Sequence, residues 1–298
     1  MALSSFTLTQ GVADQPVEMP AVGFGVYKID QPGQCETAVR EALEVGYRLI
    51  DTAQMYQNER EVGQALKHAF DSGEVSREDV FVTTKLWIKD QGYEAAKAAV
   101  DRSRSALGLD TIDMFLIHQP YGDIYGTWRA FEELLSDGVL RAVGVSNFTP
   151  DRVVDLCLNT SVVPAVNQIE LHPFLQQKQA REIAEEFGVR LQAWAPFARG
   201  KNGLFSNEVL GAIAEKHGVG IGQVVIRWLL DSGISAIPKS VHRHRMESNF
   251  DVFGFQLDAD DQAAIAGLDL ETSFFKDPRD PQAVKDLCAR DAQLARAC

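Results

Sequence analysis

Four polar side chains in the first half of the chain are of the types that enzymes use for proton transfer. Asp51, Lys85 and His118 each end a short apolar run, and Tyr56 follows Asp51 by five residues. A carboxylate, an ammonium, an imidazole and a phenol together suit proton transfer to a carbonyl oxygen. The set therefore indicates chemistry at a carbonyl group.

Each of the four residues has a role in that chemistry. A tyrosine has a reference pKa of about 10 and is a weak acid at neutral pH. A Lys85 ammonium about 4 Å away would favour the phenolate by roughly 4 kcal/mol at an effective dielectric of 20, so we expect it to lower the pKa of Tyr56. Asp51 would hold Lys85 charged, and His118 would donate a hydrogen bond to the carbonyl oxygen.

Taken one at a time, these residues also have ordinary interpretations. Asp51 could form a turn or cap a helix, Lys85 could be solvated, and His118 could be structural. Their joint placement after three successive strand-like runs favours the catalytic interpretation.

Short apolar runs alternate with amphipathic stretches along most of the chain. Several runs are apolar throughout, which is typical of parallel strands covered on both faces. The predicted strands are residues 22–27, 47–50, 80–84, 112–117, 142–145, 165–169, 190–193 and 234–237. The predicted helices are residues 35–45, 59–70, 93–107, 125–135, 151–158, 177–187 and 222–230. This alternation indicates an α/β fold, a (β/α)₈ TIM barrel, whose active site lies in the loops after the strands.

The remaining segments are also interpreted. Residues 6–20 alternate apolar and polar side chains around a turn, so we expect a β-hairpin over the barrel floor. The pattern of residues 206–217 predicts an extra helix. After Leu270 the sequence is polar and irregular, which predicts a loop over the barrel mouth and then a short helix. Because no linker or repeat interrupts the pattern, residues 1–298 are interpreted as one domain.

Composition narrows the classes of partner. With 298 residues and 45% hydrophobic side chains, the chain can bury a full core. The net charge of −13 argues against a nucleic-acid partner and an anionic membrane surface. No apolar run approaches the roughly 18 residues of a membrane span, and the N-terminus lacks signal-peptide features. Cys35, Cys157, Cys288 and Cys298 are far apart, so we expect free thiols, a cytoplasmic protein and no metal site.

The chain resembles the aldo-keto reductases from about residue 6 to residue 275. The matching segments are GFGVYK at 23–28, GYRLIDTAQMYQNEREVG at 46–63, TKLW at 84–87, LIHQP at 116–120, GVSNF at 144–148, NQIELHP at 167–173 and IPKS at 237–240. The catalytic tetrad of that family falls on Asp51, Tyr56, Lys85 and His118. The resemblance implies an NADPH-dependent reductase of aldehydes and ketones, in which the nicotinamide supplies hydride and Tyr56 protonates the oxygen.

The same resemblance implies the residues that hold NADPH. Ser146, Asn147 and Gln168 would bind the carboxamide, and Trp194 would stack on the nicotinamide ring. The other implied ligands are Lys239, Ser240 and Arg245 for the 2′-phosphate and Asn249 for the adenine.

The phosphate ligands lie in 238–245, the most basic run of an acidic chain. Arginine offers a planar fork to phosphate and lysine a point charge, which favours NADPH over NADH. The chain departs from the family pattern nearby. Ala195 replaces a common serine, Ser248 replaces a common glutamate, and His242 and Arg243 replace the usual Thr-Pro. We expect the last two to add positive charge near the phosphate.

Substrate contacts are predicted at the barrel rim. Tyr27 and Trp87 are candidate pocket walls, as are Phe274 and Phe275 of the tail. Gln119 stands where the family usually has tryptophan, so that wall is smaller and more polar. This favours small aldehydes, dicarbonyls or sugar-derived keto acids over bulky steroids. The resemblance is strongest to the microbial diketogluconate-reductase and prostaglandin F synthase branch, which is often monomeric, so we expect a monomer.

Three alternatives remain open at this point. Tyr93 and Lys97 have the YxxxK spacing of short-chain dehydrogenases, but the glycine-rich turn that this class needs after its first strand is missing. A cofactor-binding protein with little turnover would have the same fold. A metal-dependent barrel hydrolase would need ligands at several strand ends, where the sequence offers only scattered ones.

Overall fold

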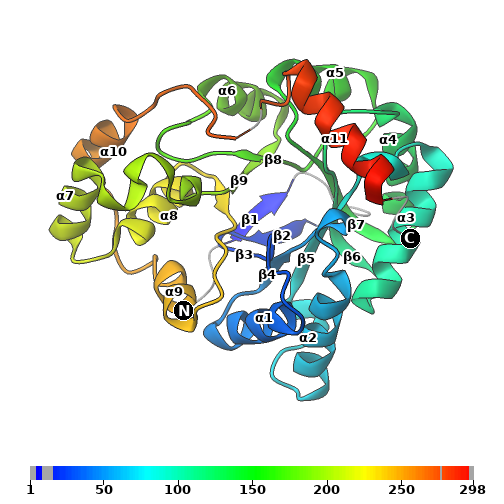
Figure 1. The fold of residues 1–298 in the computed structure, drawn as a ribbon, viewed down its shortest axis with the longest axis horizontal. Helices are drawn as coiled ribbons and strands as arrows, with labels where there is room; N and C mark the ends of the chain where they lie inside the picture. The colour runs from blue at the N-terminus through cyan, green and yellow to red at the C-terminus, as the bar shows by residue number, and fades with distance from the viewer. Residues whose placement is uncertain (1–4, 9–15, 276, 295–298) are drawn as a thin grey trace.

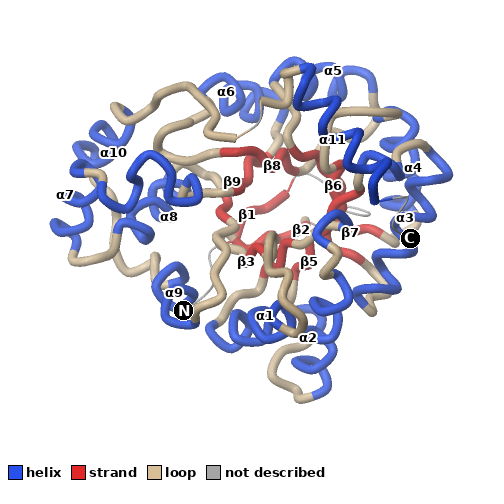
Figure 2. The backbone as a smooth tube through the Cα atoms, in the orientation of Figure 1, coloured by secondary structure: helices blue, strands red, loops and turns tan. Residues whose placement is uncertain are grey.

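A closed ring of eight parallel strands forms the centre of the computed structural model, which describes residues 5–8, 16–275 and 277–294 (Figures 1 and 2). The strands are β3 (Phe24–Gly25), β4 (Leu49–Asp51), β5 (Phe81–Leu86), β6 (Ile112–Ile117), β7 (Leu140–Ser146), β8 (Val166–Glu170), β9 (Arg190–Trp194) and β10 (Ser235–Ala236). They follow one another in chain order. Val22 pairs with Ala236, and the Gly23 amide donates to the Ala236 carbonyl at 2.8 Å, which closes the ring. The predicted (β/α)₈ barrel is confirmed.

Helices surround the ring (Figure 2). They are α1 (Gln34–Val45), α2 (Glu59–Asp71), α3 (Tyr93–Leu107), α4 (Ile124–Ser136), α5 (Pro150–Asn159), α6 (Lys178–Phe187), α7 (Glu208–His217), α8 (Ile221–Asp231), α9 (Arg243–Phe250), α10 (Ala259–Ala266) and α11 (Pro281–Leu294). The seven predicted barrel helices and the extra helix α7 are confirmed, whereas α9 and α10 were not predicted. Within the described residues no single helix is long and apolar enough to cross a membrane; only the bent pair of α7 and α8, with an 88° break, passes that test of length and composition.

The strands form where the sequence predicts them because their side chains are buried on both faces. Every residue of β5 and β6 is buried, as expected for strands with the barrel interior on one side and helices on the other. Burial of the apolar side chains in these strands is the main driving force for this arrangement.

An antiparallel hairpin covers the floor of the barrel. Strand β1 (Ser5–Leu8) pairs with β2 (Val17–Pro20). Leu8, Val17 and Met19 are buried and pack with interior residues of the strands, among them Leu49 and Met114. The hairpin prediction is therefore confirmed, and its turn lies outside the described residues.

The segment after Leu270 lies at the cavity mouth and leads into α11, as expected, although α11 has 14 residues and is not short. Glu170, at the end of β8, fastens this segment. Its carboxylate accepts hydrogen bonds from the Ser273 hydroxyl at 2.5 Å and from the Phe274 amide at 3.1 Å. The Leu270 amide also donates to the Phe174 carbonyl at 3.0 Å.

Candidate active site

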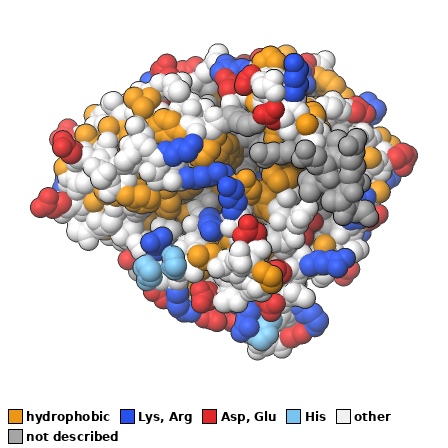
Figure 3. All heavy atoms as spheres, viewed as in Figure 1, with side chains coloured by type: hydrophobic (Ala, Val, Ile, Leu, Met, Phe, Trp, Pro, Cys, Tyr) orange, Lys and Arg blue, Asp and Glu red, His pale blue; other side chains and the backbone are white. Residues whose placement is uncertain are grey.

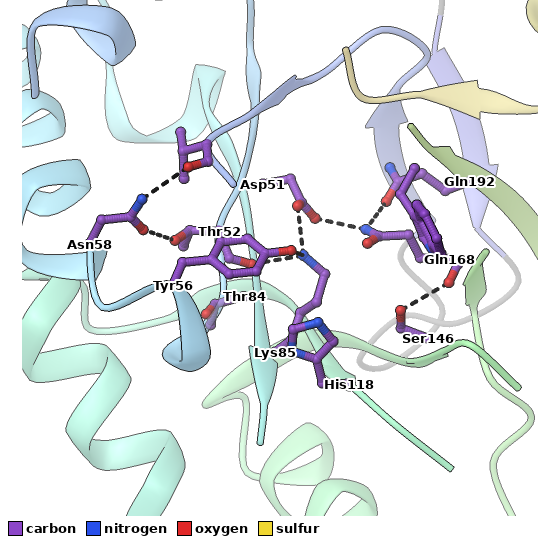
Figure 4. A network of polar contacts seen from close by, with 12 residues as sticks. Asp51, Thr52, Tyr56, Asn58, Thr84, Lys85, His118, Ser146, Gln168 and Gln192 are labelled. Carbon is purple, nitrogen blue, oxygen red and sulfur yellow. Dashed lines mark hydrogen bonds and ion pairs between the residues drawn. The ribbon is translucent and has the colours of Figure 1, made fainter. Parts of the chain in front are cut away.

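The four residues predicted to be catalytic meet at the C-terminal ends of three neighbouring strands (Figure 4). Asp51 is the last residue of β4, Lys85 lies near the end of β5, and His118 directly follows β6. Tyr56 ends the 3₁₀ turn Gln54–Tyr56 in the loop after β4. Parallel neighbours in register bring these strand ends to one rim of the barrel.

The loop that carries Tyr56 is fixed by Asn58. The Asn58 side chain accepts a hydrogen bond from Thr52 Oγ1 at 2.8 Å and donates to the Val26 carbonyl at 3.0 Å. Asn58 is buried, so these bonds hold the loop between β4 and α2 against the neighbouring strand β3.

Lys85 is buried and is the centre of a hydrogen-bond network. Its Nζ donates to Asp51 Oδ1 at 2.6 Å, to the Thr52 carbonyl at 2.9 Å and to Tyr56 Oη at 3.5 Å. These three acceptors match the three donors of an ammonium group. The second Asp51 oxygen accepts from Gln168 Nε2 at 2.7 Å, and the same nitrogen donates to Gln192. The Gln168 amide nitrogen, predicted as a carboxamide ligand, thus supports Asp51 in this structure.

Burial controls the protonation of the tetrad. It raises the pKa of Asp51 and lowers the pKa of Lys85, so the two charges depend on each other. Burial also raises the pKa of Tyr56 well above its usual value, and the Asp51 charge adds to this. The predicted lowering of this pKa by Lys85 is wrong, because burial disfavours the phenolate and the Asp51 carboxylate, 2.6 Å from Lys85 Nζ, offsets the ammonium charge. Tyr56 is therefore a protonated phenol that can donate.

His118 is a neutral imidazole. Burial lowers its pKa well below the usual value, and the Lys85 charge acts in the same direction. Its Nδ1 is buried and has no hydrogen-bond partner among the described residues. An unpartnered imine nitrogen is less costly than an unpartnered N–H, which places the proton on Nε2.

A cavity of about 1120 Å³ opens above the tetrad. Asp51, Tyr56 and His118 line it, and Lys85 lies beneath them. Four of the five side chains predicted at the substrate pocket line it as well: Tyr27, Trp87, Gln119 and Phe275. Phe274 does not: its ring stacks on His172, with centroids 5.3 Å apart. Phe274 therefore belongs to the support of the tail and not to the pocket wall.

One wall of the cavity is preorganised by polar contacts. Trp194 Nε1 donates to Asn147 Oδ1 at 2.9 Å, and Asn147 Nδ2 donates to the His118 carbonyl at 2.9 Å. Ser146 Oγ donates to the Gln168 carbonyl at 2.9 Å. Asn147 has a left-handed backbone with φ 61°, a conformation that costs energy and is concentrated at functional sites. An indole beside amide and hydroxyl groups fits a flat ring that carries an amide.

Sequence comparison decides the family. The family model described as Aldo/keto reductase family matches residues 21–270. The chain belongs to the aldo-keto reductase family. A Bacillus subtilis glyoxal reductase is 45% identical over 85% of this chain and 90% of its own length. A Trypanosoma cruzi 9,11-endoperoxide prostaglandin H2 reductase is 44% identical over 88% of this chain and 92% of its own length.

Solved structures agree with this assignment. A mutant of Gox0644 in complex with NADPH has a TM-score of 0.85 and 39% identity, with 93% of this chain and 98% of that chain covered. This aldo-keto reductase is therefore an NADPH-dependent oxidoreductase that reduces carbonyl groups. The short-chain-dehydrogenase alternative is excluded by the family and by position, because Tyr93 and Lys97 lie on α3 and both bond to Glu133 of α4.

The other predicted NADPH ligands lie around the start of α9. Lys239 lines the cavity, Ser240 is buried two residues before the helix cap, and Arg245 is exposed in the first turn. Neither Lys239 nor Arg245 forms an ion pair with a described residue. Cations that form no ion pair and lie at a helix N-terminus fit a phosphate group, although the Asp30 carboxylate acts on the pKa of Lys239. Asn249 is buried further along the same helix.

Arg243 does not add free charge there, contrary to the prediction. Its guanidinium pairs with Glu44, and its Nε lies 3.1 Å from Glu247. Sequence reasoning also missed Arg199, which lines the cavity from the segment Ala198–Ser206 after β9. The signal was available, because residues 198–201 form a second short basic run directly after a strand.

Proposed function

We propose that this aldo-keto reductase reduces small aldehydes, dicarbonyls or sugar-derived keto acids to alcohols, with Tyr56 as the proton donor. The observation that carries the proposal is the position of the Tyr56 phenol at the cavity floor, with its oxygen 3.5 Å from Lys85 Nζ. Burial raises the pKa of this phenol, which favours its protonated form. When bound, NADPH supplies the hydride that reaches the carbonyl carbon.

The four side chains divide the work. The Tyr56 hydroxyl gives its proton to the oxygen that becomes the alcohol. Lys85, held by Asp51, fixes the position of that hydroxyl. The Nε2–H of a neutral His118 donates a hydrogen bond to the carbonyl oxygen, which stabilises the negative charge that develops there.

The proposed cofactor ligands are those predicted from the sequence. Ser146, Asn147 and Gln168 would hold the carboxamide, and Trp194 would stack on the ring. The remaining ligands would be Lys239, Ser240 and Arg245 for the 2′-phosphate and Asn249 for the adenine. The hydrogen bonds among Trp194, Asn147 and His118 support this proposal, because they fix the side chains of this cavity wall before NADPH binds.

The preference for small substrates rests on the pocket. Similarity alone does not separate small from large substrates, because the glyoxal reductase and the prostaglandin endoperoxide reductase are 45% and 44% identical to this chain. Gln119 lines the cavity and gives it a short, polar wall. Trp87 packs against His118, with ring centroids 5.0 Å apart, and narrows the space beside the tetrad.

The direct test is loss of NADPH absorbance with methylglyoxal, glyceraldehyde, an aromatic aldehyde and a keto-sugar acid, each repeated with NADH. The proposal expects turnover with NADPH, slower turnover with NADH and the best rates with the smaller carbonyls. If NADPH bound but no carbonyl in the panel reacted, the reductase proposal would fail in favour of a cofactor-binding protein.

A further inference from the structure

The charged groups that line the cavity are mostly paired with each other. Lys178 Nζ lies 3.0 Å from Asp269 and 3.3 Å from Glu271. Arg279 lies 3.0 Å from Asp277. The last two lining carboxylates, Asp51 and Glu170, are held by Lys85 and by the tail segment, respectively. The carboxylates of the cavity are therefore all engaged.

Three lining cations form no ion pair with a described residue: Lys28, Arg199 and Lys239, although the Asp30 carboxylate acts on the pKa of Lys239 and raises it against the effect of burial. Lys and Arg side chains gather around the hollow at the centre of Figure 3. In a chain with a net charge of −13, such a local excess of positive charge indicates that the cavity receives anions. The proposed function assigns Lys239 to the 2′-phosphate, which leaves Lys28 and Arg199 without a role; Arg199 lies nearer the tetrad by the contacts below.

Arg199 lies at the substrate end of the cavity. Its guanidinium carbon is 5.0 Å from the centre of the Tyr27 ring, and that ring is 4.9 Å from the ring of Tyr56. One aromatic ring therefore separates the cation from the proposed proton donor. The Arg199 charge also acts on the Tyr56 pKa, which it lowers against the larger effect of burial.

The guanidinium is held in place before any ligand binds. It also stacks on Phe275 of the tail, 4.6 Å from the ring centre, so Tyr27 and Phe275 fix it from two segments. The backbone of Arg199 is left-handed, with φ 53°, and the Gly200 amide donates to the Phe197 carbonyl at 2.8 Å. A guanidinium that contacts aromatic rings through its faces keeps its N–H edge for an acceptor.

We propose that Arg199 recognises a carboxylate on the substrate, so that the enzyme prefers carbonyl compounds that carry a negative charge a few atoms from the reacting carbonyl. This inference rests on the proposed function and narrows its substrate class toward keto acids and aldehyde acids. The planar fork of arginine matches the two oxygens of a carboxylate.

The test compares two aldehydes that differ in charge, 4-carboxybenzaldehyde and its methyl ester, at saturating NADPH. We expect the wild-type enzyme to have a higher kcat/KM for the acid than for the ester. Arg199→Gln should lower the acid-to-ester ratio by about tenfold, the low end for a hydrogen bond to a charged group, because Arg199 is exposed. Comparing the ratio between enzymes cancels the different intrinsic reactivities of the two aldehydes.

Lys201→Gln is the matched control. Lys201 carries the same charge on the same segment and lies 4.5 Å from the centre of the Phe275 ring, yet it does not line the cavity. This variant should keep the wild-type ratio. If both variants lowered the acid-to-ester ratio equally, the preference would come from the overall charge of the segment, and the proposal would be overturned.

The remaining outcomes separate Arg199 from the cofactor. Arg199→Gln could instead raise the KM for NADPH and lower kcat/KM equally for the two aldehydes. Arg199 would then bind the NADPH pyrophosphate, and the proposal would be wrong. Turnover of the ester without any preference for the acid in the wild-type enzyme would sustain the reductase function but refute carboxylate recognition. If the wild-type enzyme reduced neither aldehyde, the reductase function itself would be refuted.

Discussion

The ion pair between Asp51 and Lys85 is almost completely shielded from water, with side-chain exposures of 2% and 0%. Lys85→Met should therefore leave Asp51 buried without a counterion and lower the free energy of unfolding by about 3–5 kcal/mol. The double variant Asp51→Asn with Lys85→Met removes both charges and should recover most of that stability. Urea denaturation measures the free energy of unfolding of both variants. A single variant as stable as the double variant would show that the pair is not coupled.

Turnover should not follow stability in this series. Both variants lack the ammonium that contacts Tyr56, so we expect kcat to remain low in the double variant even when its stability returns. Stability and turnover together separate the contribution of the ion pair to folding from the contribution of Lys85 to the position of Tyr56.

The protonation of Tyr56 predicts a flat pH profile. Because its pKa is raised, loss of the phenol proton moves to higher pH, and the donor stays protonated below the ordinary tyrosine pKa of about 10. The kcat for carbonyl reduction should thus be constant between roughly pH 6 and pH 9. Steady-state rates at saturating substrate and NADPH test this. A decline centred between about pH 7 and pH 8 would mean that the phenol ionises far more easily than its burial indicates.

At the scale of elements, helix α9 offers a matched pair of arginines for cofactor choice. Arg245 has no ion pair with a described residue, whereas Arg243 is paired with Glu44 and Glu247. Arg245→Gln should raise the KM for NADPH by about tenfold or more and leave the KM for NADH nearly unchanged, because only NADPH carries the 2′-phosphate. Arg243→Gln should change neither. If the two variants changed the KM for NADPH equally, Arg245 would not be the ligand of the 2′-phosphate.

The elements that sequence analysis predicted are those with a clear hydrophobic pattern. The strands β5 and β6 are rich in apolar side chains and buried at every position, and their ends place Lys85 and His118. Helix α9 was missed because its sequence, RHRMESNF, buries only Met246 and Asn249 and has no apolar periodicity. Local patterns predict elements that bury one or both faces, and they fail for short polar helices fixed by tertiary contacts.

Contacts between distant segments could not be predicted. Glu170 was seen only as part of a motif, while its partners Ser273 and Phe274 lie 103 and 104 residues further along. The direction of the Tyr56 pKa shift could not be predicted for a related reason: the sequence points to Lys85 as a neighbour, whereas burial and the Asp51 carboxylate decide the direction. Sequence identified the chemical groups, but the balance of charges depends on the packed site.

At the scale of the molecule, we propose that residues 1–298 fold as one domain and act as a monomer. The closed ring of strands supports this, because it joins the first and last barrel strands through the pairing of Val22 with Ala236. Thermal unfolding should then be a single transition, with tryptophan fluorescence and far-UV circular dichroism changing together. Two separated transitions would contradict the single domain, and a concentration-dependent midpoint would contradict the monomer.

The Tyr56 hydroxyl is the proposed proton donor, and Tyr56→Phe removes it without changing the rest of the side chain. The variant keeps the ring that packs against Tyr27 at 4.9 Å and removes only the proton donor. We expect kcat with a reactive aldehyde to fall by about 100-fold or more, the usual contribution of a positioned acid. Quenching of tryptophan fluorescence by NADPH should remain as in the wild-type enzyme, because Trp87 and Trp194 still line the cavity. A variant that kept most of its turnover would show that another group protonates the substrate.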